Sequence, residues 1–447
     1  MKFSSPLLLA VLASLLPALS HAAPNIVFIV ADDMGYADCG VQGCKDVPTP
    51  HLDALAASGI RFTDGYVTGA VCSPTRAALM TGRYHHRDGV HDWLPPGKPG
   101  LDPAVPLVAG YLKKAGYHTA LIGKWHLGEQ PDCHPNQRGF DEFYGFLGGG
   151  RSYFPDKPKK PDAKENLYTQ ILRNNERVQL TEYATTAFGR EAAAFVERQK
   201  PEHPFFLYLA FNAVHTPMEP PEELRQKFAS IEDPKRRAYA GMLSAMDSSI
   251  GTVLDALRKI GAENNTVVSF ISDNGGPITR NAPNSSQNTP LRGGKGQTWE
   301  GGIRVPFFLK WPDRLKPGLY SKPVIQMDLT ATALALAGVR ADAQWPMDGV
   351  NLLPFLEGSQ AEPHPHLCWS YDRQWAVRKG NWKLVLAGPE KGQPAPVEAL
   401  YDIAADPSET RDLSAQNPKQ IEDLRAIWKA WASEVRVDLS ASPAKPH

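Results

Sequence analysis

The stretch Asn25-Ile26-Val27-Phe28-Ile29-Val30 is a continuous apolar run rich in β-branched residues. Such a run is typical of a strand buried on both faces of a parallel sheet, because a strand with one solvated face would alternate apolar and polar residues. Similar runs recur at 117–122, 205–211, 266–271 and 305–311. Helical patterns stand around and between them, at 51–58, 107–116, 181–198, 235–260 and 327–337. This order predicts an α/β fold with a large mixed, mainly parallel sheet sandwiched by helices.

Polar side chains follow four of these runs, close to the point where each predicted strand ends. They are Asp32 and Asp33, Lys124 and His126, His215, and Asp273 and Asn274. The carboxyl ends of parallel strands share one edge of the sheet, where ligands bind, so we expect these side chains to meet there. Two adjacent carboxylates at the end of a buried strand repel each other, which favours a neutralising cation between them.

The chemistry of these residues indicates hydrolysis of an anionic ester. Three carboxylates and an asparagine oxygen form a hard oxygen site suited to Ca²⁺ or Mg²⁺, and the lack of nearby histidine ligands argues against Zn²⁺. Arg76, Lys124 and Lys295 supply positive charge for a tetrahedral oxyanion and its transition state. His126 and His215 can transfer protons near neutral pH.

A further motif, Val71-Cys72-Ser73-Pro74-Thr75-Arg76, is typical of a turn that leads into a helix. Ser73 is suited to cap the helix, and Pro74 to its first turn. We therefore expect Cys72 at a helix N-terminus, where the dipole favours an anion and lowers a thiol pKa. Arg76 should lie about one turn along the same face.

The Cys-Ser-Pro-Thr-Arg sequence, with Thr81-Gly82-Arg83 after it, resembles the signature of the type I sulfatases of the alkaline phosphatase superfamily. The resemblance covers nearly the whole mature chain. It includes Asn25 to Asp33, Gly123-Lys124-Trp125-His126, Ser272-Asp273-Asn274-Gly275, Gly294-Lys295, the stretch from Glu300 to Pro306, Tyr401-Asp402 and Asp406-Pro407. It implies an alkaline-phosphatase-like fold and sulfatase activity.

The resemblance also implies the cofactors and the site. In that family a dedicated formylglycine-generating or anaerobic sulfatase-maturating enzyme converts the cysteine, here Cys72, to formylglycine. The implied ligands of one Ca²⁺ are Asp32, Asp33, Asp273, Asn274 and the modified Cys72. Arg76, Lys124, His126, His215 and Lys295 complete the implied catalytic site.

The implied reaction is an in-line displacement in two steps. An oxygen of the hydrated formylglycine attacks sulfur while Ca²⁺, Lys124 and Lys295 hold the sulfate oxygens. His215, helped by Lys295, protonates the leaving alcohol. The remaining hydroxyl, with His126 as base, then expels sulfate and restores the aldehyde.

The expected substrate is a sulfated carbohydrate, such as a glycosaminoglycan, a mucin glycan or an algal polysaccharide. Several residues outside the motifs are candidates for sugar contacts, with the alternative that each is a solvated surface residue. They are His85, His91, Asp92, Trp93, Arg151, Asp372 and Arg373.

Three other functions stay open from the sequence. The first is phosphate or phosphonate ester hydrolysis, although two-metal members of the superfamily place a histidine where this chain has Asn274. The second is a catalytically silent carbohydrate-binding protein that keeps the fold. The third is an enzyme that uses an unmodified Cys72 thiolate.

The chain divides into three predicted parts. Residues 1–22 have a lysine, an apolar run and small residues before Ala22, which is typical of a cleaved secretory signal peptide. No lipoprotein cysteine follows, so we expect a secreted or periplasmic protein with no membrane span. Residues 23–348 form the predicted catalytic domain, and 349–447 a small antiparallel sheet with one packed helix.

Charge and cysteine content add two constraints. Lys plus Arg and Asp plus Glu number 48 each, so the chain is neutral and gives no general argument for binding nucleic acid. In an oxidising compartment, Cys39 and Cys44 are close enough to form a disulfide, with a metal site as the alternative. Whether Cys133 and Cys368 pair is open.

Overall fold

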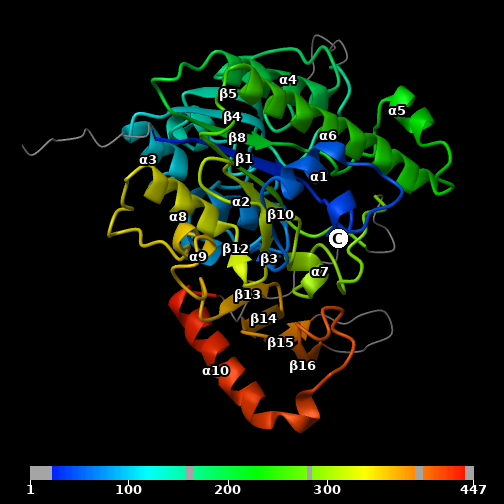
Figure 1. Ribbon diagram of the computed structural model, residues 1–447, viewed down its shortest axis with the longest axis vertical. Coiled ribbons are helices and arrows are strands. Elements are labelled where there is room, and N and C mark those ends of the chain that lie inside the picture. The colour runs from blue at the N-terminus through cyan, green and yellow to red at the C-terminus, as the bar shows by residue number, and fades with distance from the viewer. Residues whose placement is uncertain (1–22, 157–165, 279–283, 388–395, 438–447) are drawn as a thin grey trace, which may run out of the picture.

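The computed structural model describes residues 23–156, 166–278, 284–387 and 396–437 (Figure 1). The expected signal peptide, 1–22, lies outside them. Ten strands form the main sheet in the order β11-β2-β10-β9-β1-β8-β4-β5-β6-β7. They are β1 (Asn25–Ala31), β2 (Ile60–Phe62), β4 (His118–Lys124), β5 (Glu142–Phe146), β6 (Leu172–Arg173), β7 (Glu176–Arg177), β8 (Phe205–Ala210), β9 (Thr266–Ser272), β10 (Phe307–Lys310) and β11 (Gly318–Tyr320).

The centre of this sheet is parallel, as the apolar runs predict. Val27 of β1 lies opposite Leu207 of β8 and Val268 of β9, and both pairings are parallel. β10, from the run at 305–311, is antiparallel to both its neighbours. The predicted fold class, a large mixed and mainly parallel sheet, is therefore confirmed.

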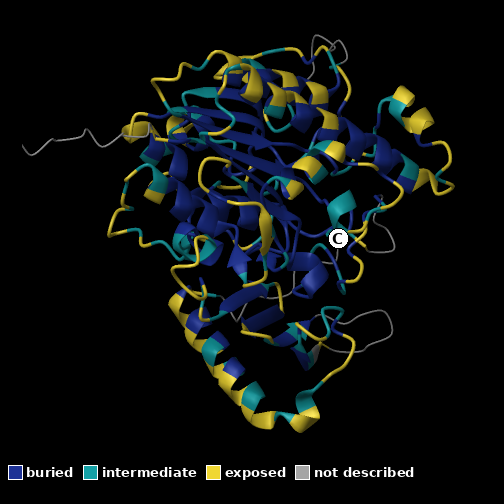
Figure 2. Cartoon of the chain, viewed as in Figure 1, coloured by how far each residue is buried: buried dark blue, intermediate teal, exposed yellow. Residues whose placement is uncertain are grey.

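Helices cover both faces of the sheet (Figure 1). One layer contains α1 (Pro50–Ala57), α4 (Ala184–Glu197) and α6 (Pro234–Lys259), and the other contains α2 (Cys72–Thr81), α3 (Val108–Lys114) and α8 (Met327–Leu336). Alternate residues of β1 serve the two cores, because Val27 packs with the first layer and Phe28 with the second. Figure 2 shows the sheet buried and the outward helix faces exposed. Short helices α5 (Glu222–Lys227), α7 (Glu300–Ile303) and α9 (Leu353–Leu356), and the strand pair β3 (Gly65–Tyr66) and β12 (Val324–Ile325), complete this part.

A second, antiparallel sheet follows near the C-terminus, at the bottom of Figure 1. It contains β13 (Leu367–Tyr371), β14 (Gln374–Lys379), β15 (Trp382–Ala387) and β16 (Val397–Asp402), and α10 (Pro418–Glu434) packs against it. The Trp375 and Trp428 rings stack with centroids 4.6 Å apart, which joins the helix to the sheet. A domain boundary near residue 348 stays a prediction.

A buried ion cluster joins the C-terminal sheet to helix α7. Lys383 Nζ of β15 lies 2.9 Å from Glu300 Oε1 and 2.8 Å from Glu409 Oε1, and all three side chains are fully buried. Burial and the charge of Glu300 raise the pKa of Glu409 to about 7, although Lys383 acts to lower it. The lysine therefore holds two carboxylates that would otherwise repel each other.

Replacing this lysine should destabilise the fold strongly. In Lys383→Met the buried Glu409 loses its cation and Glu300 keeps Arg304, at 3.2 Å, so we expect the free energy of unfolding to fall by about 3–5 kcal/mol. Lys322→Met is the control, because Lys322 forms a half-exposed pair with Glu362 at 3.1 Å, worth about 0–1 kcal/mol. Urea denaturation measures the free energy of unfolding of both variants. Equal losses in the two would contradict the role given to Lys383.

The cysteines differ from the expectation. All five are free thiols, so Cys39 and Cys44 form no disulfide and Cys133 does not pair with Cys368. The two sulfurs of the 39–44 loop make separate hydrogen bonds instead: Cys39 Sγ donates to Gln42 Oε1 at 2.9 Å and Cys44 Sγ to Asp46 Oδ1 at 3.2 Å. Among the described residues, no helix has the length and apolar character needed to cross a membrane.

Candidate functional site

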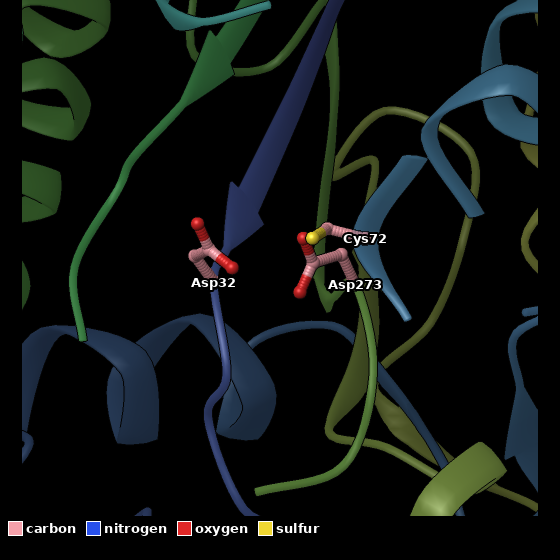
Figure 3. A group of neighbouring side chains, drawn as sticks. All are labelled: Asp32, Cys72 and Asp273. Carbon is pink, nitrogen blue, oxygen red and sulfur yellow. The ribbon is translucent and has the colours of Figure 1, made fainter. Parts of the chain in front are cut away.

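The carboxyl ends of β1, β4, β8 and β9 form one site, as the strand pattern predicts. Figure 3 shows Asp32 following β1, Asp273 following β9, and Cys72 reaching toward them from the start of α2. Ligand atoms of these three side chains all lie within 4.8 Å of one another, and so do those of Asp32, Asp33 and His215. Residues more than 200 positions apart in the chain therefore meet at one edge of the sheet.

Asp32 is fully buried between two cations. Lys124 Nζ donates to its Oδ2 at 2.5 Å, and Arg76 Nη2 lies 3.8 Å from the same oxygen. Burial acts to raise the pKa of Asp32, but the charges of Lys124 and Arg76 outweigh it and hold the pKa below its usual range. Asp32 is therefore a carboxylate at neutral pH.

Asp33 is held by Lys295 and Asn274. Lys295 Nζ lies 2.7 Å from Asp33 Oδ1 and 2.9 Å from Oδ2, and Asn274 Nδ2 donates to Oδ1 at 2.8 Å. His215 Nε2 lies 3.8 Å from Oδ2. Asp33 has a φ of 62°, a left-handed conformation that turns the chain sharply after the strand.

Asp273 binds Arg76 through two hydrogen bonds. Arg76 Nε and Nη2 donate to Asp273 Oδ2 at 3.0 and 2.8 Å, and the other oxygen, Oδ1, accepts from the Asp33 backbone N–H at 3.2 Å. Burial, followed by the charge of Asp32, raises the pKa of Asp273. Arg76 opposes that rise and fixes the carboxylate in place.

The charges and the free oxygens of this cluster fit a divalent cation. Three carboxylates, Asp32, Asp33 and Asp273, face three cations, Arg76, Lys124 and Lys295, so their formal charges sum to 3 − 3 = 0. Two buried oxygens of the cluster, Asp32 Oδ1 and Asn274 Oδ1, have no hydrogen-bond partner. Carboxylate and amide oxygens are ligands preferred by Ca²⁺ and Mg²⁺, so the donor set fits such an ion.

Cys72 begins α2 and its environment differs in two ways from the expectation. The helix starts at Cys72 with Val71 in the capping position, because the Ser73 hydroxyl accepts a hydrogen bond from Leu94 N at 3.1 Å instead of capping the helix. The pKa of the Cys72 thiol is raised, not lowered, since burial outweighs the nearby charges of Lys124 and Lys295. An unmodified Cys72 is therefore a poor nucleophile, which argues against the thiolate enzyme.

Both histidines favour the neutral form, with His126 buried and His215 half-buried at the pocket. Burial is the largest cause that lowers the pKa of each, and the neighbouring Lys124 adds to the effect at His126. His126 Nε2 donates to the Leu94 carbonyl at 3.1 Å, which leaves its buried Nδ1 without a partner and free to accept a proton. His126 has a φ of 58°, a left-handed conformation that turns the chain after β4.

A pocket of about 460 Å³ opens beside this cluster. Cys72, His126, His215 and Lys295 form part of its wall, whereas Arg76 and Lys124 are fully buried behind it. Three aromatic side chains complete much of the wall: Trp93, Tyr168 and Tyr371. The pocket therefore combines a charged end with an aromatic surface of the kind that accepts a sugar ring.

Of the predicted sugar-contact residues, only one lies in the pocket wall. Trp93 lines the pocket, and Asp92 is tied to it by accepting from the Trp93 N–H at 2.7 Å. His85 is fully buried between the Val90 and Thr68 carbonyls, which corrects its predicted role in sugar contact. The other four candidates are not in the pocket wall: Arg151 is buried and pairs with Asp156 at 2.7 Å, while His91, Asp372 and Arg373 are exposed.

Two pocket residues, Tyr168 and Tyr371, were not predicted. Tyr168 lies in a connection and Tyr371 ends β13, beside the predicted Asp372, and a lone tyrosine carries no functional signal of its own. The Tyr168 hydroxyl donates to the Leu94 carbonyl at 3.3 Å and lies 3.4 Å from His126 Nε2. Only the folded chain brings them to the site.

Comparison with known proteins decides the family. The family model described as Sulfatase matches residues 24–339, and the model for the C-terminal part of N-sulphoglucosamine sulphohydrolase matches residues 294–434. The chain belongs to the sulfatase family. This sulfatase is 34% identical to human arylsulfatase A, over 94% of its own length and 89% of the relative's. It is also 33% identical to human N-acetylgalactosamine-6-sulfatase, over 80% of its own length and 71% of the relative's.

A solved structure agrees with the sequence relatives. The crystal structure of Ps i-CgsB superimposes with a TM-score of 0.86 at 39% identity, and the match covers 94% of each chain. The same protein was solved in complex with k-i-k-neocarrahexaose. The family resemblance deduced from the sequence motifs is confirmed, and the protein is a sulfuric ester hydrolase.

Proposed function

We propose that this sulfatase hydrolyses sulfate monoesters of carbohydrates, with residue 72 as formylglycine and one Ca²⁺ per chain. The observation that carries the proposal is the arrangement around Cys72. Three carboxylates balanced by three cations, two unpaired ligand oxygens and two neutral imidazoles converge on one side chain in the pocket wall. A bound Ca²⁺ would give this balanced cluster a net charge of +2, which attracts an anionic ester.

The residues that would hold the ion are Asp32, Asp33, Asp273, Asn274 and the modified residue 72. When bound, Ca²⁺ would polarise a sulfate oxygen and stabilise negative charge. Arg76 and Lys124 orient the ligands, because Arg76 binds Asp273 and Lys124 binds Asp32 without reaching the pocket. Lys295 reaches the pocket wall and is the cation we assign to the sulfate group.

The histidines are assigned to proton transfer. A hydrated formylglycine at residue 72 would supply the nucleophilic oxygen that the unmodified thiol cannot. His126 is neutral with its Nδ1 free, so it suits a base for the hydroxyl of residue 72. His215 and Lys295 stand nearer Asp33 and are assigned to protonate the leaving alcohol. The negative charge of a bound ester would raise the pKa of His215 and favour this role.

The position of His126 can be tested through a glycine. A Cβ on Gly149 would lie 2.6 Å from His126 Nε2 and 2.7 Å from the Tyr168 hydroxyl. We expect Gly149→Ala to displace His126 and lower kcat for sulfate release by about 10- to 100-fold, with little change in Tm. In the control, Gly150→Ala, the new Cβ meets no atom of His215 closer than 3.6 Å, and kcat should be nearly unchanged. Equal kcat values for the two variants would contradict this placement.

The substrate proposal rests on the pocket and on the relatives. The aromatic surface beside the charged end suits a sugar ring. Human N-acetylgalactosamine-6-sulfatase and the Ps i-CgsB complex with k-i-k-neocarrahexaose connect similar chains to amino-sugar and oligosaccharide chemistry. Glycosaminoglycan, mucin and algal saccharides are therefore the substrates to compare. The signal peptide and a maturating enzyme as partner remain part of this proposal.

The test is release of inorganic sulfate from sulfated mono- and oligosaccharides of these three classes. The protein is made together with a formylglycine-generating enzyme, and Asp32→Asn is assayed in parallel. We expect release from at least one class by the wild type only. A phosphonate monoester is assayed alongside, and release of its alcohol without any release of sulfate from the saccharides would contradict the proposal and favour a phosphonate hydrolase. Sugar binding with no hydrolysis would favour a silent binding protein.

A further inference from the structure

The connection between β13 and β14 brings the C-terminal sheet into the active-site pocket. Tyr371, the last residue of β13, lines the pocket, and Gln374, the first residue of β14, is buried. The two residues between them, Asp372 and Arg373, are exposed at the tip of the turn. Tyr371 and Gln374 each make hydrogen bonds to a different loop of the catalytic part, so the turn contacts two sides of the pocket.

Tyr371 is connected to His126 through a short chain of hydrogen bonds. Its hydroxyl donates to Asp92 Oδ1 at 3.0 Å, and the same oxygen accepts from the Trp93 N–H at 2.7 Å. The next residue, Leu94, accepts from His126 Nε2 at 3.1 Å through its carbonyl. The loop that orients the imidazole is therefore fixed at its start by a tyrosine from the other sheet.

The same loop also reaches the helix that carries Cys72. Leu94 N donates to the Ser73 hydroxyl at 3.1 Å, so Leu94 bridges the residue after Cys72 and the His126 ring. The bond from Nε2 decides which nitrogen of His126 can act as a base, because it leaves Nδ1 unprotonated. A shift of Leu94 would therefore change both the position and the proton state of His126.

Gln374 acts on the segment that carries Lys295. Its Nε2 donates to the Gly296 carbonyl at 2.9 Å, and its Oε1 accepts from the Thr298 N–H at 3.4 Å. Lys295 lies between Gly294 and Gly296, and Gly296 has a φ of 79°. The amides of this segment are bonded, Gly294 N to Gln297 Oε1 at 3.0 Å and Gly296 N to the Ala70 carbonyl at 2.8 Å, and Gln374 adds the bond to the Gly296 carbonyl. Gln374 supplies an anchor from outside the segment.

We propose that Tyr371 and Gln374 are positioning residues of the active site: Tyr371 sets His126 through Asp92 and Leu94, and Gln374 sets Lys295 through Gly296. The inference rests on the proposed function for the roles of His126 and Lys295. The C-terminal sheet then contributes to catalysis, since it determines the positions of His126, which transfers a proton, and Lys295, which binds the sulfate group.

The kinetic consequences of the two contacts differ. Tyr371→Phe keeps the ring in the pocket wall and removes only the bond to Asp92. We expect kcat to fall about tenfold while KM changes less than about twofold, because His126 acts after the substrate is bound. Gln374→Glu cannot donate to the Gly296 carbonyl, so Lys295 moves; here we expect KM to rise and kcat to fall, each about three- to tenfold.

The experiment combines those kinetics with backbone amide hydrogen exchange, which does not require an active enzyme. Tyr371→Phe should speed exchange of the Trp93 and Leu94 amides and leave that of the Lys295 and Gly296 amides unchanged. Gln374→Glu should do the reverse. The control is Tyr117→Phe, which removes a buried hydroxyl bond of 3.1 Å to the Pro24 carbonyl at the far end of the sheet. Tyr117→Phe should change neither the amide exchange rates of the two loops nor kcat.

Three results would decide against the inference or separate it from the proposed function. Exchange and kcat equal to wild type in either variant would overturn the role of that residue. A fall in Tm with faster exchange throughout the C-terminal sheet would show a merely structural role. A wild type that releases no sulfate would defeat the proposed function, while the exchange rates would still decide whether the turn fixes the two loops.

Discussion

Cys72→Ala should abolish sulfate release. The account assigns the nucleophilic oxygen to the modified side chain at this position, and alanine offers no group that can replace it. Loss of the nucleophile in a covalent mechanism removes nearly all catalysis, so we expect kcat/KM to fall by at least about 10⁴-fold. Inorganic sulfate is measured with the best substrate of the saccharide panel. The fold should persist, because Cys72 is a free thiol and forms no disulfide.

Cys72→Ser separates the modified residue from a generic nucleophile. Serine keeps an oxygen at the start of α2, but in protein made without conversion of that residue it cannot form the hydrate. The unconverted Cys72→Ser variant should therefore release no sulfate beyond a single turnover per chain. Multiple turnovers by unconverted Cys72→Ser would show that the site uses an ordinary hydroxyl, and would contradict the assigned mechanism.

Removing the metal should cost nearly as much activity. Asp32→Asn keeps the shape of the side chain but removes its negative charge and replaces one of its two oxygens, of which Oδ2 accepts from Lys124 and Oδ1 is the proposed metal ligand. We expect the bound Ca²⁺ to fall from one per chain to nearly none, and kcat/KM to fall by about 10³-fold. Metal content by mass spectrometry and sulfate release check the two results separately.

Chelation of the wild type provides an independent measurement. Removal of Ca²⁺ should stop sulfate release and lower Tm, and adding Ca²⁺ back should restore both. The control is Asp247→Asn, which alters a buried carboxylate that accepts the His51 and Leu52 amides far from the site. It should keep one Ca²⁺ per chain. Full activity of the wild type after chelation would contradict the assigned metal site.

The sequence predicted where the strands end because each strand is a long apolar run buried on both faces. For such a run burial alone determines the element, and the parallel order then brings Asp32, His215 and Asp273 together. The errors arose where a distant contact decides the outcome. Ser73 is a good capping residue locally, but Leu94 occupies its hydroxyl. The thiol of Cys72 was expected to be acidic, but it is buried, and burial outweighs charge.

The pocket wall was less predictable than the catalytic cluster. Only Trp93 of the predicted sugar contacts lines the pocket, and His85 is buried behind it. Tyr168 comes from a loop and Tyr371 from the end of β13 in the second sheet, and no local pattern determines that either reaches the pocket. A motif marks residues that chemistry requires at fixed spacing, whereas the shape of a substrate pocket depends on loops and on a second sheet far along the chain.

The measurement that tests the central claim most directly relates activity to the state of residue 72. Protein is prepared with different fractions of formylglycine, by varying the supply of the maturating enzyme, and each fraction is measured by mass spectrometry of the peptide containing residue 72. Sulfate release per chain is then plotted against that fraction. The account predicts a straight line through the origin. Sulfate release by fully unconverted protein, or none by fully converted protein on any saccharide, would contradict it.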